Sequence, residues 1–193
     1  MRKEGLKEKI LLFSIIVLCI SLIGYGSFAY FTTEGQATNV ITMGNIEIEV
    51  VEKMLDENGQ IVEYQDQIGV LPSQSVSKIA MVENTGEQTA WIRVKVEKII
   101  NLADPSSGQV DDSLISIDFN QIDWTYKDGY YYYNEPLMMS EMTEPLFTTV
   151  NFDKKMGNIY QDAEVLIVIK AYATQKANNG QSVFEAAGWP SED

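Results

Sequence analysis

Apolar and charged side chains alternate with a period of two along several stretches of this 193-residue chain. Ile46, Ile48 and Val50 alternate with Glu47 and Glu49. Successive side chains of a β-strand point to opposite faces of the sheet, so this spacing predicts a strand with one face on a core and one in water. Residues 92–97 repeat the pattern with Ile, Val and Val against Arg, Lys and Glu, which predicts a second strand of this kind.

A third segment has a different pattern. Val165 to Ile169 is apolar without a break and β-branched at four of five positions, and polar and small residues then alternate up to Thr174. Continuous apolar runs are typical of strands that are covered on both faces. The segment is therefore predicted to be a long central strand, whose early part is covered on both faces and whose late part is covered on one face.

Turn residues separate the expected strands. Asn58-Gly59 lies between residues 50–54 and 61–64, and Asn84-Thr85-Gly86 lies between residues 79–82 and 91–96. Both are interpreted as hairpin connections. A two-residue loop at Asp128-Gly129 predicts a third hairpin, in which the facing pairs are Tyr126 with Tyr131, Trp124 with Tyr133, and Thr125 with Tyr132.

Helical signals are few. Ser182 is a candidate cap for a short helical turn that would stop at Gly188. Residues 101–113, rich in Asp, Ser, Pro and Gly, are expected to form an exposed loop. No repeat and no long linker divides the rest, so residues 46–193 are expected to form one all-β domain, a jelly-roll-like β-sandwich.

The N-terminus has the features of an export signal. The basic residues Arg2, Lys3, Lys7 and Lys9 precede an apolar stretch from Ile10 to Gly24, and Ser27-Phe28-Ala29 provides a small-x-small exit. The stretch is shorter than the ~20 residues of a spanning helix. We therefore expect residues 1–29 to be a signal peptide that forms a helix, cleavage between Ala29 and Tyr30, and a secreted or cell-surface product that touches the membrane only through the uncleaved signal.

Cleavage of the pilin type, ahead of the apolar stretch, is an alternative at Gly5-Leu6. Glu8 stands third rather than fifth after Gly5, and Gly24 ends the apolar run where a pilin helix would continue. Both features favour the export signal over the pilin alternative.

Charge limits the partners. The chain has 14 basic and 28 acidic residues, and the signal removes four and two of these, which leaves 10 against 26 and a formal charge of −16. Such a surface repels phosphate backbones, so nucleic acid is not expected as a partner. The acid content favours solubility outside the cell, with weak divalent-cation binding at residues 104–112 as an alternative.

Common catalytic groups are scarce. The chain has no His, and its one Cys, Cys19, lies inside the signal, so the usual general base, a thiolate nucleophile and an ordinary zinc set are missing from the mature chain. No cofactor or metal is expected. A carboxylate pair is the remaining catalytic option. Aromatic residues from Trp124 to Tyr133, Tyr131 among them, could stack on a carbohydrate, although cross-strand packing explains them equally well.

Three segments of the chain resemble the TasA/camelysin family of Gram-positive bacteria. The first runs from Gly26 through Ala29 and Phe31-Thr32-Thr33 to Gly44-Asn45-Ile46, and is similar to the start of that family. The other two are a hairpin-like segment and the body with the last strand, namely Val76-Ser77-Lys78 with Val82-Glu83-Asn84-Thr85-Gly86 and Ala90-Trp91-Ile92-Arg93-Val94, and Asp128-Gly129 to Tyr133 with Leu146-Phe147 and Ala171-Tyr172-Ala173-Thr174-Gln175.

The resemblance implies export through a SipW-type signal peptidase and a jelly-roll domain that assembles into extracellular matrix or biofilm fibres, with itself or with a related secreted protein. It also implies that an extended arm, residues 30–45, leaves its own subunit and adds a strand to the next one. The arm is polar, small and β-branched, which suits main-chain pairing along a sheet edge, although a flexible terminus is an alternative. The residues expected to carry assembly are Phe31, Thr32, Thr33, Thr38, Asn39, Val40 and Ile41.

Two other functions remain open. Some members of the family are described as metallopeptidases, but without His the activity is not carried over to this chain, and a camelysin-like peptidase stays the enzymatic alternative. A cell-surface carbohydrate-binding module is the other. The C-terminus, Trp189-Pro190-Ser191-Glu192-Asp193, carries no sorting motif, so covalent attachment to the cell wall is not expected.

Overall fold

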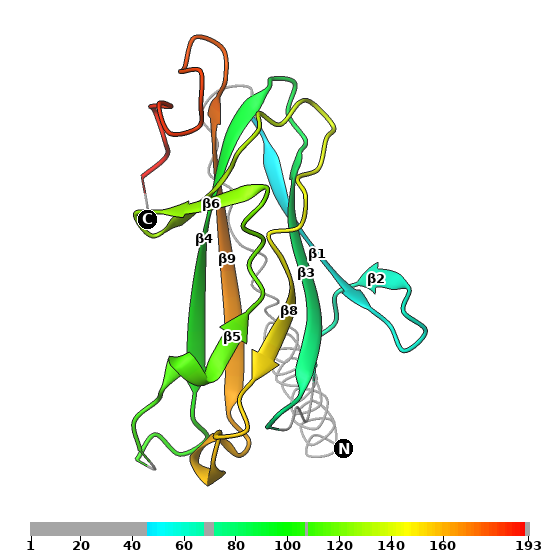
Figure 1. Ribbon diagram of the computed structural model, residues 1–193, viewed down its shortest axis with the longest axis vertical. Coiled ribbons are helices and arrows are strands. Elements are labelled where there is room, and N and C mark those ends of the chain that lie inside the picture. The colour runs from blue at the N-terminus through cyan, green and yellow to red at the C-terminus, as the bar shows by residue number, and fades with distance from the viewer. Residues whose placement is uncertain (1–45, 68–71, 107, 192–193) are drawn as a thin grey trace, which may run out of the picture. The chain divides into compact units, whose positions relative to one another are not determined.

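A computed structural model describes residues 46–67, 72–106 and 108–191 of the chain (Figure 1). By its internal contacts the chain divides into two compact units, residues 1–37 and 38–193, and all the described residues belong to the second. The expected signal helix, the cleavage site at Ala29 and Tyr30, and the seven residues expected to carry assembly lie outside the described residues. No helix in the described ranges is both long enough and apolar enough to cross a membrane.

In the described part of the chain, nine strands form two antiparallel sheets that pack as a sandwich, so the expected all-β fold of jelly-roll-like type is confirmed (Figure 1). The five-stranded sheet has the order β2 (Ile61–Glu63), β1 (Ile48–Leu55), β3 (Ser75–Asn84), β8 (Phe147–Phe152) and β5 (Ile115–Ile117). The four-stranded sheet has the order β6 (Trp124–Lys127), β7 (Tyr130–Tyr133), β4 (Ala90–Asn101) and β9 (Glu164–Gln175). Two short 3₁₀ helices, η1 (Asp112–Leu114) and η2 (Asn158–Tyr160), lie in the connections.

The chain passes repeatedly from one sheet to the other. The strand pairs β3 and β4, β4 and β5, and β8 and β9 follow each other in sequence but lie in different sheets. Such connections place consecutive segments on both sides of one core, as in jelly-roll sandwiches. The two sheets therefore share a core to which nearly every part of the described chain contributes.

The core follows from the period-two pattern. Ile92 and Val94 are fully buried, while the alternating Arg93 and Lys95 lie on the outer face of the four-stranded sheet. The largest fully buried side chains come from both sheets and from the loops between them, including Trp124, Phe147, Ile92, Ile115 and Leu146. Burying a large apolar side chain of this kind contributes about 1.5–3 kcal/mol, so this shared core dominates the stability of the sandwich.

Two of the three predicted hairpins are confirmed. β1 and β2 pair around Asn58-Gly59, with Leu55 opposite Ile61. β6 and β7 pair in the expected register, with Tyr126 opposite Tyr131. The turn residues of the β6–β7 hairpin, Asp128 and Gly129, have positive φ angles of 50° and 87°. A two-residue loop of type I′ needs this backbone, which Asp and Gly tolerate, and the turn therefore fixes the register.

The hairpin predicted at Asn84-Thr85-Gly86 is wrong, because β3 and β4 lie in different sheets and the turn carries the chain across the sandwich. Asn84 is fully buried, and its side-chain amide donates to the carbonyl oxygens of Gln88, at 2.8 Å, and Leu137, at 2.9 Å. The backbone N–H of Gly86 donates to Asn84 Oδ1 at 3.1 Å. The same turn residues serve a hairpin or a crossing arch, and here the hydrogen bonds of the buried amide hold the arch.

The helical turn expected after Ser182 is only a single turn, closed by a hydrogen bond from the Glu185 N–H to the Ser182 carbonyl at 3.1 Å. Gly188, where the turn was expected to stop, has a φ of +71°, which favours glycine. The segment folds back over the four-stranded sheet instead of forming a helix, since Val183 from its middle is buried.

Candidate assembly site

β9 lies at an edge of the four-stranded sheet. It pairs with β4 along its whole length of 12 residues, from Ala90 opposite Gln175 to Asn101 opposite Glu164. Within residues 46–67, 72–106 and 108–191 no strand pairs with its other side. The other three edge strands, β2, β5 and β6, have only three, three and four residues. A long open edge presents a row of unpaired main-chain groups, so β9 is the strand edge best suited to accept another strand.

The prediction for this segment is therefore wrong in two respects. β9 is an edge strand in the described part of the chain, not a central one, and its late half is the better covered. Residues 171–174 are buried on both faces, whereas residues 165–168 are only half-buried. The prediction failed because the cover of the late half comes from a different part of the sequence, the C-terminal segment.

The C-terminal segment, residues 176–191, covers the outer face of the late half. Thr174 Oγ1 donates to the carbonyl of Ala187 at 2.9 Å, and Asn179 Nδ2 donates to Thr174 Oγ1 at 3.1 Å. On the neighbouring strand, the indole Nε1 of Trp91 donates to the carbonyl of Asn179 at 3.0 Å. These bonds hold the C-terminal segment over one end of the β4–β9 pair.

An aromatic cluster around Arg93 strengthens this cover. The guanidinium carbon of Arg93 lies 4.0 Å from the ring centroid of Tyr130, 4.7 Å from that of Trp189 and 5.3 Å from that of Tyr172. Such cation–π contacts contribute about 0.5–2 kcal/mol each. Sequence reasoning missed this cluster because its rings come from β7, β9 and the C-terminal segment, and only the alternation in the tyrosine run gave a hint.

The early half of β9 has apolar residues on both faces. Val165, Ile167 and Ile169 belong to the inner face, where Ile169 is buried and the other two pack against the core while half-buried. Leu166 and Val168 alternate with them on the outer face and are half-buried. Leu166 lies opposite Ile99 of β4, which is 40% exposed. Ile99, Leu166 and Val168 together form the outer apolar stripe.

Charged residues bound this stripe. The carboxylate of Glu97 on β4 forms ion pairs with the ammonium groups of Lys95, at 3.4 Å, and Lys170, at 3.3 Å. Exposed ion pairs of this kind contribute less than about 1 kcal/mol. Lys95 and Lys170 face each other between the two halves of β9, and Glu97 lies opposite Val168, so the outer face of the sheet is polar at this boundary.

The residues considered for sugar stacking have structural contacts. Trp124 is 1% exposed, its Nε1 donates to the carbonyl of Glu144 at 3.0 Å, and its ring leans on that of Tyr133. Tyr131 stacks on Phe119 with 4.2 Å between the ring centroids, and burial raises the pKa of its phenol to about 12. Tyr131 also packs across the hairpin on Tyr126, with 4.8 Å between the ring centroids, so both residues have packing roles within the sandwich.

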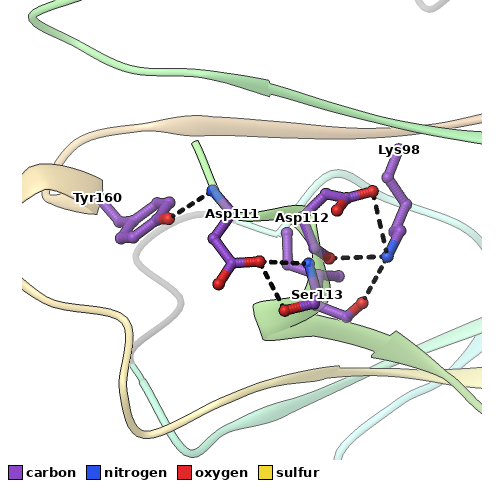
Figure 2. A network of polar contacts seen from close by, with 6 residues as sticks. Lys98, Asp111, Asp112, Ser113 and Tyr160 are labelled. Carbon is purple, nitrogen blue, oxygen red and sulfur yellow. Dashed lines mark hydrogen bonds and ion pairs between the residues drawn. The ribbon is translucent and has the colours of Figure 1, made fainter. Parts of the chain in front are cut away.

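Carboxylates of the acidic loop, residues 104–112, form hydrogen bonds and ion pairs with nearby residues (Figure 2). The Asp111 carboxylate accepts hydrogen bonds from the Ser113 hydroxyl and N–H, and these bonds lower the pKa of Asp111. Lys98 Nζ donates to the carbonyls of Asp112, at 2.7 Å, and Ile115, at 2.9 Å. In the described ranges no group of three carboxylates, thiols or imidazoles is placed to hold a metal ion.

A cleft of about 430 Å³ opens between the two sheets, beside the short edge strand β5. Its lining is mostly apolar and includes Val96, Ile115, Phe119 and Tyr131, together with the stem of Lys98. The ammonium of Lys98 is bonded to the carbonyls of Asp112 and Ile115, and the other polar residues of the lining are Ser113, Ser116, Tyr126 and Tyr131.

Comparison of the chain with protein-family models, with curated proteins and with solved structures finds no match. The functional argument therefore depends on the residues and their geometry. One feature of the described residues stands out, the long edge of β9 with apolar side chains on both faces of its early half.

Proposed function

We propose that this protein is a secreted structural subunit of an extracellular matrix or biofilm fibre, in which the arm of one subunit, residues 30–45, adds a strand to a sheet edge of the next. The observation that carries the proposal is the 12-residue strand β9, which has no partner on one side among the described residues. Natural sheets usually shorten, charge or cover such edges. An edge left this long is suited to pairing with another chain.

The lengths are compatible. At ~3.3 Å per residue, the 12 residues of β9 offer an edge of ~40 Å. An arm of 16 residues reaches ~50 Å when extended, which is enough to cover the edge and to leave a short connection to its own sandwich. Main-chain hydrogen bonds supply the affinity in this mode of recognition, and side chains at alternate positions supply the specificity.

Export fits the same proposal. The Lys/Arg-rich start, the apolar stretch and the exit at Ala29 direct the chain to a SipW-type signal peptidase, and cleavage there frees Tyr30 as the first residue of the arm. The arm is then available to a neighbouring subunit outside the cell. The formal charge of −16 on each mature chain opposes close association, so assembly proceeds more readily at high salt, where this repulsion is screened.

The test compares the mature chain, residues 30–193, with a chain that lacks residues 30–42. Electron microscopy and light scattering should show fibres or oligomers for the first and monomers for the second. The matched control is a chain in which residues 30–42 are replaced by a Gly/Ser segment of equal length, which keeps the length but loses the β-branched and apolar side chains. The control should also stay monomeric.

Near-UV circular dichroism of all three chains checks that the sandwich is folded. Polymers of equal length and yield from the folded deletion variant would rule out the arm as the donor. Monomers from the full mature chain at every pH and salt concentration would remove the basis of the subunit proposal itself.

A further inference from the structure

The cleft beside β5 has an aromatic wall that runs from the core to the surface. Phe119 and Tyr131 stack with 4.2 Å between their ring centroids, and the centroids of Tyr131 and Tyr126 lie 4.8 Å apart. All three residues line the cleft. Phe119 and Tyr131 are half-buried, whereas Tyr126 is 63% exposed. The outermost ring of this wall is therefore accessible to a ligand.

The other wall includes the main chain of β5. This strand pairs with β8 on one side only, and in an antiparallel ladder the main-chain groups of successive residues point alternately toward the partner and away from it. The carbonyl of Leu114 accepts a hydrogen bond from the N–H of Asp153 at 2.8 Å, so the even-numbered residues of this stretch point toward β8. Ile115 and Ile117 therefore point their main-chain groups toward the open edge.

Ile115 has partners for both of these groups. Its N–H donates to the carbonyl of Asp112, and its carbonyl accepts from Lys98 Nζ at 2.9 Å. Because Lys98 lines the cleft, this edge of β5 faces the cleft. Within the described ranges no strand pairs with the same edge at Ile117. The N–H and the C=O of Ile117 thus offer one donor and one acceptor, side by side, to a ligand in the cleft.

The charge of the lining limits what this ligand can be. Lys98 is the only charged residue among the described residues that line the cleft. Its ammonium donates to the carbonyl of Asp112 at 2.7 Å and lies 3.8 Å from the carboxylate of the same residue (Figure 2). The formal charge of −16 on the mature chain also repels anions in general. The cleft therefore suits a neutral ligand.

We propose that this cleft binds a neutral saccharide, with one hexose unit lying on the ring of Tyr126. The face of a pyranose ring carries C–H groups that pack on an aromatic ring, and its rim carries neighbouring hydroxyl groups. One hydroxyl accepts from the N–H of Ile117, and the next donates to its carbonyl. The cleft volume of about 430 Å³ lies within the range of roughly 300–1,000 Å³ that is typical of ligand sites.

Other neutral ligands fit less well. β5 has only three residues, and the main-chain groups of Ile115 already have partners, so an added peptide strand would gain main-chain bonds from Ile117 alone. A purely apolar ligand would cover the N–H and C=O of Ile117 without bonding to them, which costs free energy. A ligand with an apolar face and a hydroxyl-bearing rim meets both requirements.

This site goes beyond the proposed function and does not depend on it. Its walls belong to β5, to the β6–β7 hairpin and to Phe119, whereas assembly is proposed to use residues 30–45. A saccharide held here would join a fibre subunit to a polysaccharide of the surrounding matrix. A chain that lacks residues 30–42 should therefore bind the saccharide as tightly as the mature chain does.

Calorimetric titration of the mature chain tests the inference with four probes. Cellohexaose and isomaltohexaose are neutral glucose hexamers with different linkages. A hexamer of glucuronic acid with the linkage of cellohexaose supplies the same ring shape with negative charge. A short Val/Thr peptide with blocked ends supplies an extended strand. We expect saturable binding of at least one neutral hexamer, and at least about tenfold weaker binding of the glucuronate and of the peptide.

Variants of the mature chain locate the site. Tyr126→Ala should weaken binding of the neutral hexamer by at least about tenfold, because the ring on which the sugar lies is lost. Ile117→Pro removes an N–H that lies outside the ladder and should weaken it by about fivefold. Phe184→Ala, at a ring that is 43% exposed and does not line the cleft, is the matched control and should leave the affinity unchanged. Tyr126→Phe keeps the ring and should bind like the parent.

Near-UV circular dichroism checks that each variant is folded, and Tyr126→Ala tests the site even where Ile117→Pro does not fold. Failure of both neutral hexamers to bind, or equal affinity of Tyr126→Ala and Phe184→Ala, would overturn the inference. Preference for the peptide would assign the cleft to an extended chain instead. These outcomes leave fibre formation untouched, whereas fibres indifferent to the loss of residues 30–42 would remove the proposed function and leave the saccharide site in place.

Discussion

The two halves of β9 belong to one strand, pair with one neighbour and share one core, yet they differ in what covers them. Residues 171–174 lie between the core and the C-terminal segment and are buried. Residues 165–168 are more apolar in sequence and less covered in the structure. Apolar character alone therefore does not bury a strand: the late half is buried because the C-terminal segment covers it, and no such segment covers the early half among the described residues.

The largest expected effect is the difference in stability between two variants that each place a lysine in one half of β9. Tyr172 is 5% exposed and lies on the outer face of the late half next to Arg93, so Tyr172→Lys loses a buried ring and puts a second cation there. The free energy of unfolding should fall by about 3 kcal/mol or more. Val168→Lys, at a half-buried position on the same face of the early half, should lower the unfolding free energy of the monomer by less than about 1 kcal/mol. Urea unfolding of both variants in dilute solution measures the difference, and equal losses would show that the two halves are equally buried.

A smaller effect is expected when the cover itself is weakened. Trp189→Ala removes the ring 4.7 Å from the Arg93 guanidinium and one neighbour of Tyr132. Because a half-buried aromatic side chain and a cation–π contact are lost together, the unfolding free energy should drop by about 2 kcal/mol. Met138→Ala, at a side chain that is 55% exposed, is the control and should change stability by less than about 0.5 kcal/mol. A drop no larger than that of the control would mean that the C-terminal segment does not stabilise the late half.

Hydrogen exchange should distinguish the halves without any change in fold. In the monomeric chain, backbone amides of residues 165–168 should exchange roughly tenfold faster than those of residues 171–174, since the early half opens with less buried apolar contact. In the assembled state the early half should slow by at least the same factor, while the late half should change little. Mass spectrometry of peptides from each half reads this directly. Equal protection in the monomer would indicate that the early half is already covered.

The fold was predictable where local chemistry decides the structure. Asp128 and Gly129 both accept positive φ, so the hairpin and its register followed from two residues. The arch at Asn84 was not predictable in this way, because the buried amide finds partners that include the distant Leu137. Turn residues specify a local bend and leave open which sheet the next strand joins.

The candidate site was predictable only in part. The apolar pattern of residues 165–169 correctly indicated a strand, but the expected central position and the cover on both faces of its early half were wrong. The cluster around Arg93 joins segments nearly 100 residues apart, so no local sequence pattern predicts it. The seven arm residues remain predictions, since they lie outside the described ranges.

The smallest expected effect concerns the boundary between the halves. Glu97→Gln removes the carboxylate that Lys95 and Lys170 share at 3.4 and 3.3 Å. Exposed pairs are screened by water and salt, so the unfolding free energy should fall by less than about 1 kcal/mol at low salt and by less still at 0.5 M salt, where the Debye length is shorter than roughly 5 Å. Glu57→Gln, in the exposed turn after β1, changes the net charge equally and controls for the general effect of removing an acid. A loss above about 2 kcal/mol that salt does not reduce would mean that the ion pairs couple the two halves. In that case the early half would be held in place by these ion pairs as well as by its apolar contacts.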